Sequence, residues 1–145
     1  MPTLETDLKV IVFQLIEKEY AIPVTHVRSI EKVQTITRVP NTPPYIKGVI
    51  NLRGIVTPII DLRIYFGFEE APYSDLARLI IISAGDNEVG LIVDSANDVI
   101  DIPADSIEPP PEIVGGIETN YISGVAKIDD RLLMIIELQN ILSAK

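Results

Sequence analysis

Residues 45–62 read Tyr45-Ile-Lys-Gly-Val-Ile-Asn-Leu-Arg-Gly-Ile-Val-Thr-Pro-Ile-Ile-Asp-Leu62, and residues 121–138 read Tyr121-Ile-Ser-Gly-Val-Ala-Lys-Ile-Asp-Asp-Arg-Leu-Leu-Met-Ile-Ile-Glu-Leu138. The second stretch is a copy of the first, aligned without a gap at an offset of 76 residues, with seven of 18 positions identical. Each copy is typical of a strand, a tight turn, a second strand and a short helix. One structural module is therefore present twice.

The two copies differ most at their turns, which we expect at Leu52-Arg53-Gly54 and at Asp129-Asp130. Gly54 suits a turn because glycine adopts positive φ without steric cost. The apolar strands are kept in both copies, whereas Arg53 is exchanged for an acidic residue. This change of charge suggests that the turn does more than join two strands, although a solvated arginine at a hairpin tip is the simpler interpretation.

The short helices are expected directly after the second strand of each module. Asp61 can cap the first helix, which would run through Phe66 and stop at Gly67. Glu137 begins the corresponding stretch, which would extend to Leu142.

The duplication extends towards the N-terminus, because residues 20–40 align with residues 89–109 at an offset of 69. Each of these segments begins in a predicted hairpin, around residues 17–19 in one case and 84–87 in the other. Apolar residues spaced by three then favour a short helical turn or an irregular edge. The offset grows from 69 to 76 across residues 111–120, where Gly115-Gly116 indicates a mobile loop.

The composition favours a mostly β chain. Ile and Val together account for 38 of 145 residues, and β-branched side chains fit a pleated, half-buried surface. About five short strands in each repeat indicate two small barrels. We expect residues 8–75 to form the first subdomain and residues 76–145 the second.

The composition argues against several classes of protein. The net charge of −9 and the lack of a basic cluster argue against nucleic-acid binding. There is no Cys for a disulfide or a thiolate site, and no leader or membrane-spanning apolar run is visible. We therefore expect a cytoplasmic protein without direct membrane insertion.

The sequence also lacks recognisable catalytic machinery. His26 is the single histidine and has no partner at metal-ligand or triad spacing. No phosphate-binding glycine loop or calcium-loop spacing occurs, so we expect no catalytic residue, no metal and no cofactor. A small hydrolase or ligand-binding domain using clustered carboxylates stays open as an alternative, because sequence alone cannot exclude a carboxylate pair.

The stretch Thr37-Arg-Val-Pro-Asn-Thr-Pro-Pro-Tyr-Ile-Lys-Gly-Val-Ile-Asn-Leu-Arg-Gly-Ile-Val-Thr-Pro-Ile-Ile-Asp-Leu-Arg63 resembles the CheW family of bacterial chemotaxis adaptors, as do residues 89–99 and 121–125. The resemblance implies two intertwined five-stranded SH3-like β-barrels with a groove between them, and an N-terminal strand that can be exchanged between the barrels. It further implies a non-catalytic adaptor that couples methyl-accepting chemoreceptors to the regulatory domain of the histidine kinase CheA. Other receptor-coupled kinase pathways use similar proteins and stay open.

The resemblance also implies two sets of binding residues. The receptor-facing set would comprise Val27, Ile30, Glu31, Arg53, Gly54 and Val99. Many relatives carry Glu where this chain has Ser29, so Glu31 is a candidate replacement for that acidic contact. The kinase-facing set would comprise Ile113, Val114, Asp129, Asp130 and Arg131. An apolar groove flanked by an arginine suits one face of a helical receptor tip.

Overall fold

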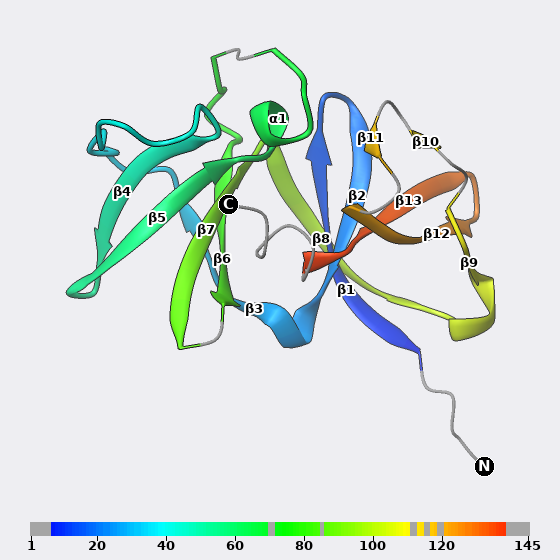
Figure 1. The fold of residues 1–145 in the computed structure, drawn as a ribbon. Coiled ribbons are helices and arrows are strands. Elements are labelled where there is room, and N and C mark those ends of the chain that lie inside the picture. The colour runs from blue at the N-terminus through cyan, green and yellow to red at the C-terminus, as the bar shows by residue number, and fades with distance from the viewer. Residues whose placement is uncertain are drawn as a thin grey trace. The chain divides into compact units, whose positions relative to one another are not determined.

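The computed structural model describes residues 7–69, 72–84, 86–110, 113–114, 117–118 and 121–138. Its regular structure is almost entirely strand, so the expected mostly β fold is confirmed (Figure 1). The helical segments among the described residues include α1 (Leu62–Tyr65) and two 3-10 turns, Val24–His26 and Ala104–Ser106. No described helix is long and apolar enough to cross a membrane.

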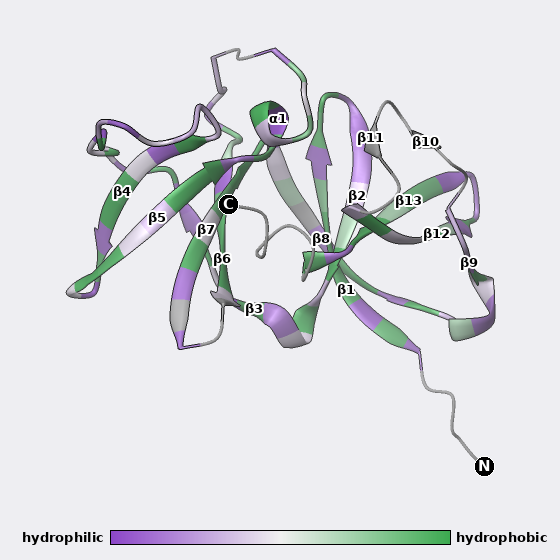
Figure 2. Cartoon of the chain, in the orientation of Figure 1, coloured by the Kyte–Doolittle hydropathy of each residue, from purple (hydrophilic) through white to green (hydrophobic). Residues whose placement is uncertain are grey.

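The chain forms two compact units, which we call unit 1 (residues 1–25 and 97–145) and unit 2 (residues 26–96). In each unit the apolar residues are concentrated along the strands (Figure 2). Unit 1 takes its strands from both ends of the sequence, whereas unit 2 is a continuous segment.

Unit 1 contains a six-stranded sheet in the order β8-β1-β2-β13-β12-β9 and a separate two-stranded sheet, β10-β11. Its core is built from apolar side chains on the inner face of the main sheet, including Val10, Ala21, Ile102 and Leu133. The strands are β1 (Leu8–Leu15), β2 (Lys18–Pro23), β8 (Ser95–Ile102), β9 (Ile107–Glu108), β10 (Ile113–Val114), β11 (Ile117–Glu118), β12 (Ile122–Ile128) and β13 (Arg131–Ile136).

Unit 2 contains a five-stranded sheet in the order β3-β6-β7-β5-β4. Its core includes Ile50, Ile59, Leu79 and Ile92, with Tyr73 packed against them. The strands are β3 (Val27–Lys32), β4 (Ile46–Leu52), β5 (Ile55–Asp61), β6 (Arg78–Ala84) and β7 (Asn87–Val93).

The two repeats exchange equivalent hairpins. The β1–β2 hairpin of the first repeat pairs with β13 of the second, with Ala21 opposite Ile135. The β6–β7 hairpin of the second repeat pairs with β5 of the first, with Gly90 opposite Ile59. Both pairings are parallel and have the same register once the offsets of 69 and 76 are applied. The spatial units therefore cut across the sequence repeats.

The modules retain the same turn geometry despite their different sequences. Arg53 and Asp129 both adopt positive φ, at 52° and 56°. In each module the same backbone hydrogen bond joins the end of the second strand to the start of the first. The Asp61 amide donates to the Tyr45 carbonyl at 2.7 Å, and the Glu137 amide donates to the Tyr121 carbonyl at 2.9 Å. The predicted turns of both modules are therefore confirmed.

Some local predictions need correction. The first hairpin turns at Ile16–Glu17, both at positive φ, rather than at residues 17–19. Apolar spacing by three does mark a 3-10 turn at Val24–His26, but residues 27–30 and 96–99 belong to strands. Helix α1 ends at Tyr65, one residue before the predicted end. Gly115, Gly116 and most of the second predicted helix lie outside the described residues.

Candidate functional site

A β-bulge in β3 brings Val27 and Ile30 to the same face of the strand. Val27 pairs with Ile82 and Ile30 with Ile80, while Arg28 is the extra residue that the bulge accommodates. Paired residues on antiparallel strands point to the same side, so the three-residue spacing does not separate the two side chains. Ile30 is 41% exposed and Val27 is partly buried. The bulge thus creates a small apolar surface at the edge of the unit 2 sheet.

Glu31 lies on the opposite face of β3 and is joined to the turn between β4 and β5. The Nη1 of Arg53 donates to Glu31 Oε2 at 3.3 Å. The Ser29 hydroxyl and then the Arg53 guanidinium hold the pKa of Glu31 below its usual value. Glu31 is therefore paired with Arg53, and its role as the replacement for the acidic contact usual at residue 29 stays a prediction.

The conformation of Arg53 departs from local preference. Its φ of 52° is one that a long side chain rarely adopts, while its own side chain is 63% exposed. Gly54 follows at φ 84° and donates its amide to Asn51 Oδ1 at 2.9 Å, which closes the turn. The hairpin thus presents a cation from a strained position.

Val99 belongs to the other repeat and lies on β8 with 57% of its surface exposed. It aligns with Ile30 at the offset of 69 residues, and both positions carry an exposed aliphatic side chain. A second pair behaves in the same way, since Val56 and Leu132 align at the offset of 76 and are 64% and 47% exposed. The duplication has therefore kept apolar surface as well as core.

The candidate kinase-facing residues divide into exposed and paired groups. Asp129 and Asp130 are exposed at the turn between β12 and β13. Arg131 instead forms two hydrogen bonds of 3.0 Å with the carboxylate of Glu19, which raise its pKa. The β10 strand contains Ile113 and Val114, whose side chains are not described.

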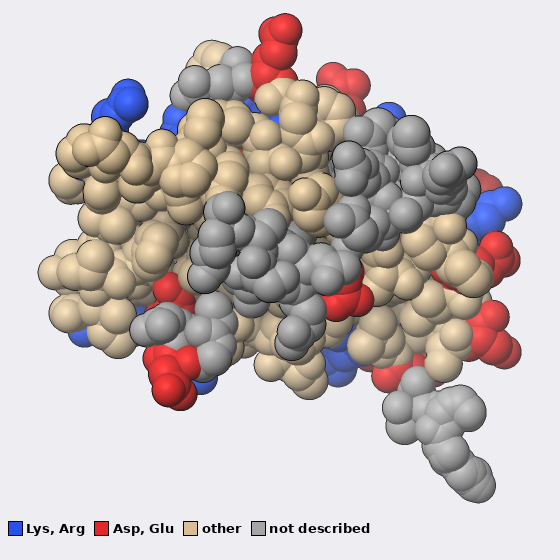
Figure 3. Space-filling model, viewed as in Figure 1, with Lys and Arg blue, Asp and Glu red and all other residues tan. Residues whose placement is uncertain are grey.

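The two units differ in charge. The residues of unit 1 include 13 Asp and Glu against five Lys and Arg, whereas unit 2 has eight against seven. Acidic side chains gather around β9 and β12 on the face shown in Figure 3, while the β4–β5 hairpin is mostly uncharged there. The residues of unit 1 therefore carry a strong net negative charge, which favours partners with a basic surface.

A buried polar network in unit 2 was not found from the sequence. Asp61 is fully buried, and its Oδ1 accepts from the Arg63 amide at 2.9 Å and the Tyr73 hydroxyl at 2.7 Å. Burial, followed by the Asp61 carboxylate, raises the pKa of Tyr73. Arg63 lies over the Tyr73 ring at 4.2 Å and donates to Asp94 at 2.7 Å. The signal available in the sequence was Asp61 at the end of an apolar strand, which predicted a helix cap but not the hydrogen bond with Tyr73.

The described residues contain no group of three or more His, Cys, Asp or Glu placed to hold a metal ion. His26 is exposed at the end of a 3-10 turn. Three carboxylates of the described residues are held in ion pairs or in a helix cap, namely those of Glu19, Glu31 and Asp61.

Comparison with known proteins gives consistent results. Residues 9–145 match the family model described as a CheW-like domain. The chain is 50% identical to the chemotaxis protein CheW of Bacillus subtilis, covering 96% of this chain and 89% of that protein. It is 36% identical to CheW of Klebsiella aerogenes, covering 93% of this chain and 81% of that protein. The crystal structure of the scaffolding protein TtCheW from Thermoanaerobacter tengcongensis superposes with a TM-score of 0.85 at 40% identity, covering 90% of this chain and 89% of the other.

Proposed function

Because this chain belongs to the CheW family of chemotaxis proteins, it is a non-catalytic scaffold, and we propose that it joins the cytoplasmic tips of chemoreceptors to the kinase CheA. The proposed location follows from these partners: the cytoplasm, with recruitment to receptor arrays. Contact with two proteins at once is the whole of this activity, and it requires surfaces rather than a reaction centre.

The observation that carries the receptor side is the bulged edge strand of unit 2. Val27 and Ile30 present apolar surface on one face of β3, and the Glu31–Arg53 pair lies at its other face. An amphipathic helix can bury its apolar stripe against such a strand, while an exposed arginine fixes its position through a carboxylate. We assign Gly54 the role of shaping the turn, and Val99 the role of a further apolar contact.

The proposed kinase side is the turn between β12 and β13 in unit 1. Asp129 and Asp130 are exposed there and Leu132 next to them is 47% exposed, a combination that suits a partner with a basic rim around an apolar centre. Ile113 and Val114 stay proposed kinase contacts on the strength of the resemblance alone. Arg131 contributes by holding the turn through Glu19.

The receptor assignment can be tested with one charge reversal and a matched control. We expect Arg53→Glu to weaken binding of a receptor-tip fragment about tenfold or more, since it removes an interfacial cation and places like charge beside Glu31. Arg38→Glu makes the same charge change at another exposed position of unit 2 and should leave binding within about twofold. Isothermal titration calorimetry measures both affinities, and thermal unfolding checks that both variants are folded.

Equal binding by the two variants would remove Arg53 from the interface. A large loss of thermal stability in Arg53→Glu without a change in affinity would give Arg53 a structural role only. The kinase side is tested in parallel with Asp129→Asn and Asp130→Asn, which should weaken binding of the CheA regulatory domain and spare the receptor fragment.

A further inference from the structure

Lys32 and Arg78 place two positive charges at the same position of neighbouring strands. They are direct partners in the antiparallel pairing of β3 with β6, and like charges that face each other across two strands are destabilising. Lys32 is exposed, while the Nη1 of Arg78 donates to the backbone carbonyls of Asp75 and Ala77 at 3.0 and 2.7 Å. The guanidinium is thus held in place, and its other N–H groups have no partner among the residues that the structure describes.

Unit 1 carries opposite charges at the equivalent position. Asp101 aligns with Lys32 and Lys9 aligns with Arg78, both at the offset of 69 residues. The β1–β2 and β6–β7 hairpins also have the same register at this offset. In unit 1 the Nζ of Lys9 lies 3.6 Å from Asp101 Oδ1, so the two residues form an ion pair. Both repeats therefore have charges at this position, but unit 2 has a cation where unit 1 has an acid.

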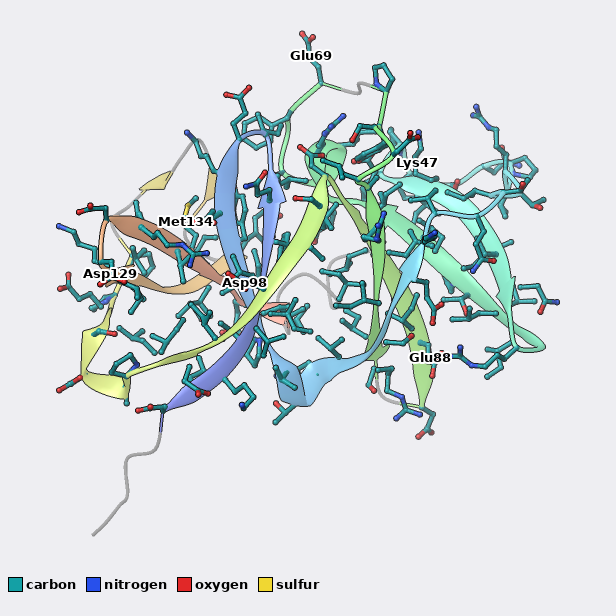
Figure 4. All side chains as sticks on the ribbon, turned by 180° about the vertical axis from the view of Figure 1, so that it is seen from behind. Lys47, Glu69, Glu88, Asp98, Asp129 and Met134 are labelled. Atoms are coloured by element: carbon teal, nitrogen blue, oxygen red, sulfur yellow. The ribbon has the colours of Figure 1, made fainter. Side chains whose placement is uncertain are left out.

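The acidic residues of the neighbouring strands do not neutralise the two cations. Glu31 lies on the other face of β3 and is joined to Arg53. Glu88 lies near the start of β7, at the end of the hairpin away from the two cations (Figure 4). Asp94, which follows β7, accepts from Arg63 at 2.7 Å. Within the described part of the chain, no acid forms an ion pair with either cation.

The two cations continue the apolar surface of β3. Ile30 lies two residues before Lys32, beyond the bulge, and both are paired with β6. Their side chains therefore point to the same side of the sheet, about 7 Å apart along the strand. In a helix, a residue and the fourth residue after it are separated by about 6 Å along the axis. A helix that packs an apolar side chain against Ile30 can thus place an acidic side chain, four residues away, beside the cations.

We propose that a carboxylate of the receptor tip binds at Lys32 and Arg78, in the role that Asp101 has beside Lys9 in unit 1. The free N–H groups of Arg78 donate to this carboxylate, and the ammonium group of Lys32 neutralises it. The identity of the partner rests on the proposed function, because the cations adjoin the receptor-facing residue Ile30. The site selects helices that carry an acid at a fixed distance from their apolar anchor, so it contributes specificity and register.

The first test reverses one of the two charges. Lys32→Glu should weaken binding of a receptor-tip fragment about tenfold in isothermal titration calorimetry, because the new carboxylate repels the acid of the partner and pairs with Arg78 itself. Lys127→Glu is the control and should stay within about twofold, since Lys127 is an exposed strand lysine paired with Leu132 rather than with a second cation. If the wild type binds the fragment and Lys32→Glu binds it equally well, this inference is overturned and the proposed function stands.

The second test uses the same substitution without a partner. Lys32→Glu replaces a repulsive pair by an attractive one, as in unit 1, so Tm should rise by about 1–3 °C. The gain should shrink at high salt and vanish in the Arg78→Gln background. A variant that is more stable and yet binds the receptor more weakly supports cations retained for a partner. No gain in Tm, or an equal gain in the Arg78→Gln background, would overturn the inference.

The third test identifies the acid of the partner by a charge swap. Each Asp and Glu of the receptor fragment is changed to Lys in turn, and each variant is titrated with the wild type and with Lys32→Glu. One fragment variant should bind Lys32→Glu more tightly than the unchanged fragment does, and should bind the wild type more weakly. The absence of any such variant would overturn the inference.

A parallel titration separates the two partners. Lys32→Glu should bind the CheA regulatory domain as the wild type does, and a loss of affinity for that domain with unchanged receptor binding would overturn the inference. Failure of the wild type to bind any receptor fragment would instead refute the proposed function and, with it, the identity of the partner.

Discussion

The substitution Gly48→Ala tests how closely the β4 edge is packed, and its cost can be worked out from the structure. Gly48 has a φ of 146°, and a Cβ built there would lie 2.1 Å from the carbonyl oxygen of Thr37. Thr37 and Val49 exchange two backbone hydrogen bonds of 2.9 Å at this point. To admit a methyl group the two segments must separate, which breaks those bonds and adds backbone strain.

The expected loss follows from these parts. Two backbone hydrogen bonds contribute about 1 kcal/mol each, and a strained backbone costs about 1–3 kcal/mol. We therefore expect Gly48→Ala to lower the free energy of unfolding by about 3–5 kcal/mol. Gly54→Ala is the matched control, because its φ of 84° is also positive but its Cβ would meet no atom within 4 Å. The control should cost about 1–2 kcal/mol, from backbone strain alone.

Urea denaturation followed by circular dichroism measures both variants, and unchanged m-values would confirm that the midpoints report stability. Equal destabilisation by the two substitutions would refute the steric reasoning, because φ would then account for the entire effect.

Three further predictions concern polar groups. Asp61→Ala should lower the free energy of unfolding by about 2–4 kcal/mol, since it removes both a helix cap and a buried hydrogen-bond acceptor. Tyr73→Phe removes a single hydrogen bond and should lower it by about 1 kcal/mol. Equal losses in urea denaturation would contradict the double role of the Asp61 carboxylate. Arg131→Met should lower the free energy of unfolding by about 1–2 kcal/mol through the loss of its pair with Glu19, and should weaken binding of the CheA regulatory domain because the turn is no longer held. Unchanged affinity in the folded variant would remove Arg131 from the kinase-facing set. Burial raises the pKa of Tyr20 from 10.0 to about 12. The contribution of the neutral Tyr20 side chain to stability is therefore complete below pH 10 and is lost as the pH rises towards 12. Absorbance at 295 nm should show one late-ionising tyrosine fewer in Tyr20→Phe, and an unchanged titration would refute the shift.

The repeated modules were predictable because their signals are local. A turn such as Arg53-Gly54 lies between two apolar strands, and Asp61 lies at the helix start, so a window of a few residues contains all that is needed. The same holds for Asp129-Asp130, although glycine is absent there. Duplication strengthened both predictions, since one module supported the other.

The exchange of hairpins between repeats was not predictable in the same way. Ala21 pairs with Ile135 across more than a hundred residues of sequence, and nothing in either segment favours that partner over the equivalent strand of its own repeat. The two alternatives bury similar side chains, because the repeats share their apolar pattern. Only the geometry of the connections decides between them.

The candidate site was located in part. Ile30 and Arg53 were identified through a resemblance, but the bulge at Arg28 that aligns Val27 with Ile30 leaves no mark in the sequence. The hydrogen bond from Tyr73 to the buried Asp61 was overlooked because the two residues are 12 positions apart, beyond the reach of a local pattern.

The most direct test of the proposed adaptor role is whether one molecule holds both partners at once. Analytical ultracentrifugation of the full-length chain with a receptor-tip fragment and the CheA regulatory domain measures this without ATP. We expect a ternary complex that contains all three proteins. With Arg53→Glu the ternary complex should be lost, whereas the binary complex of the chain with the CheA regulatory domain should remain. Two separate binary complexes that compete for the chain would contradict the coupling of receptor to kinase through distinct surfaces.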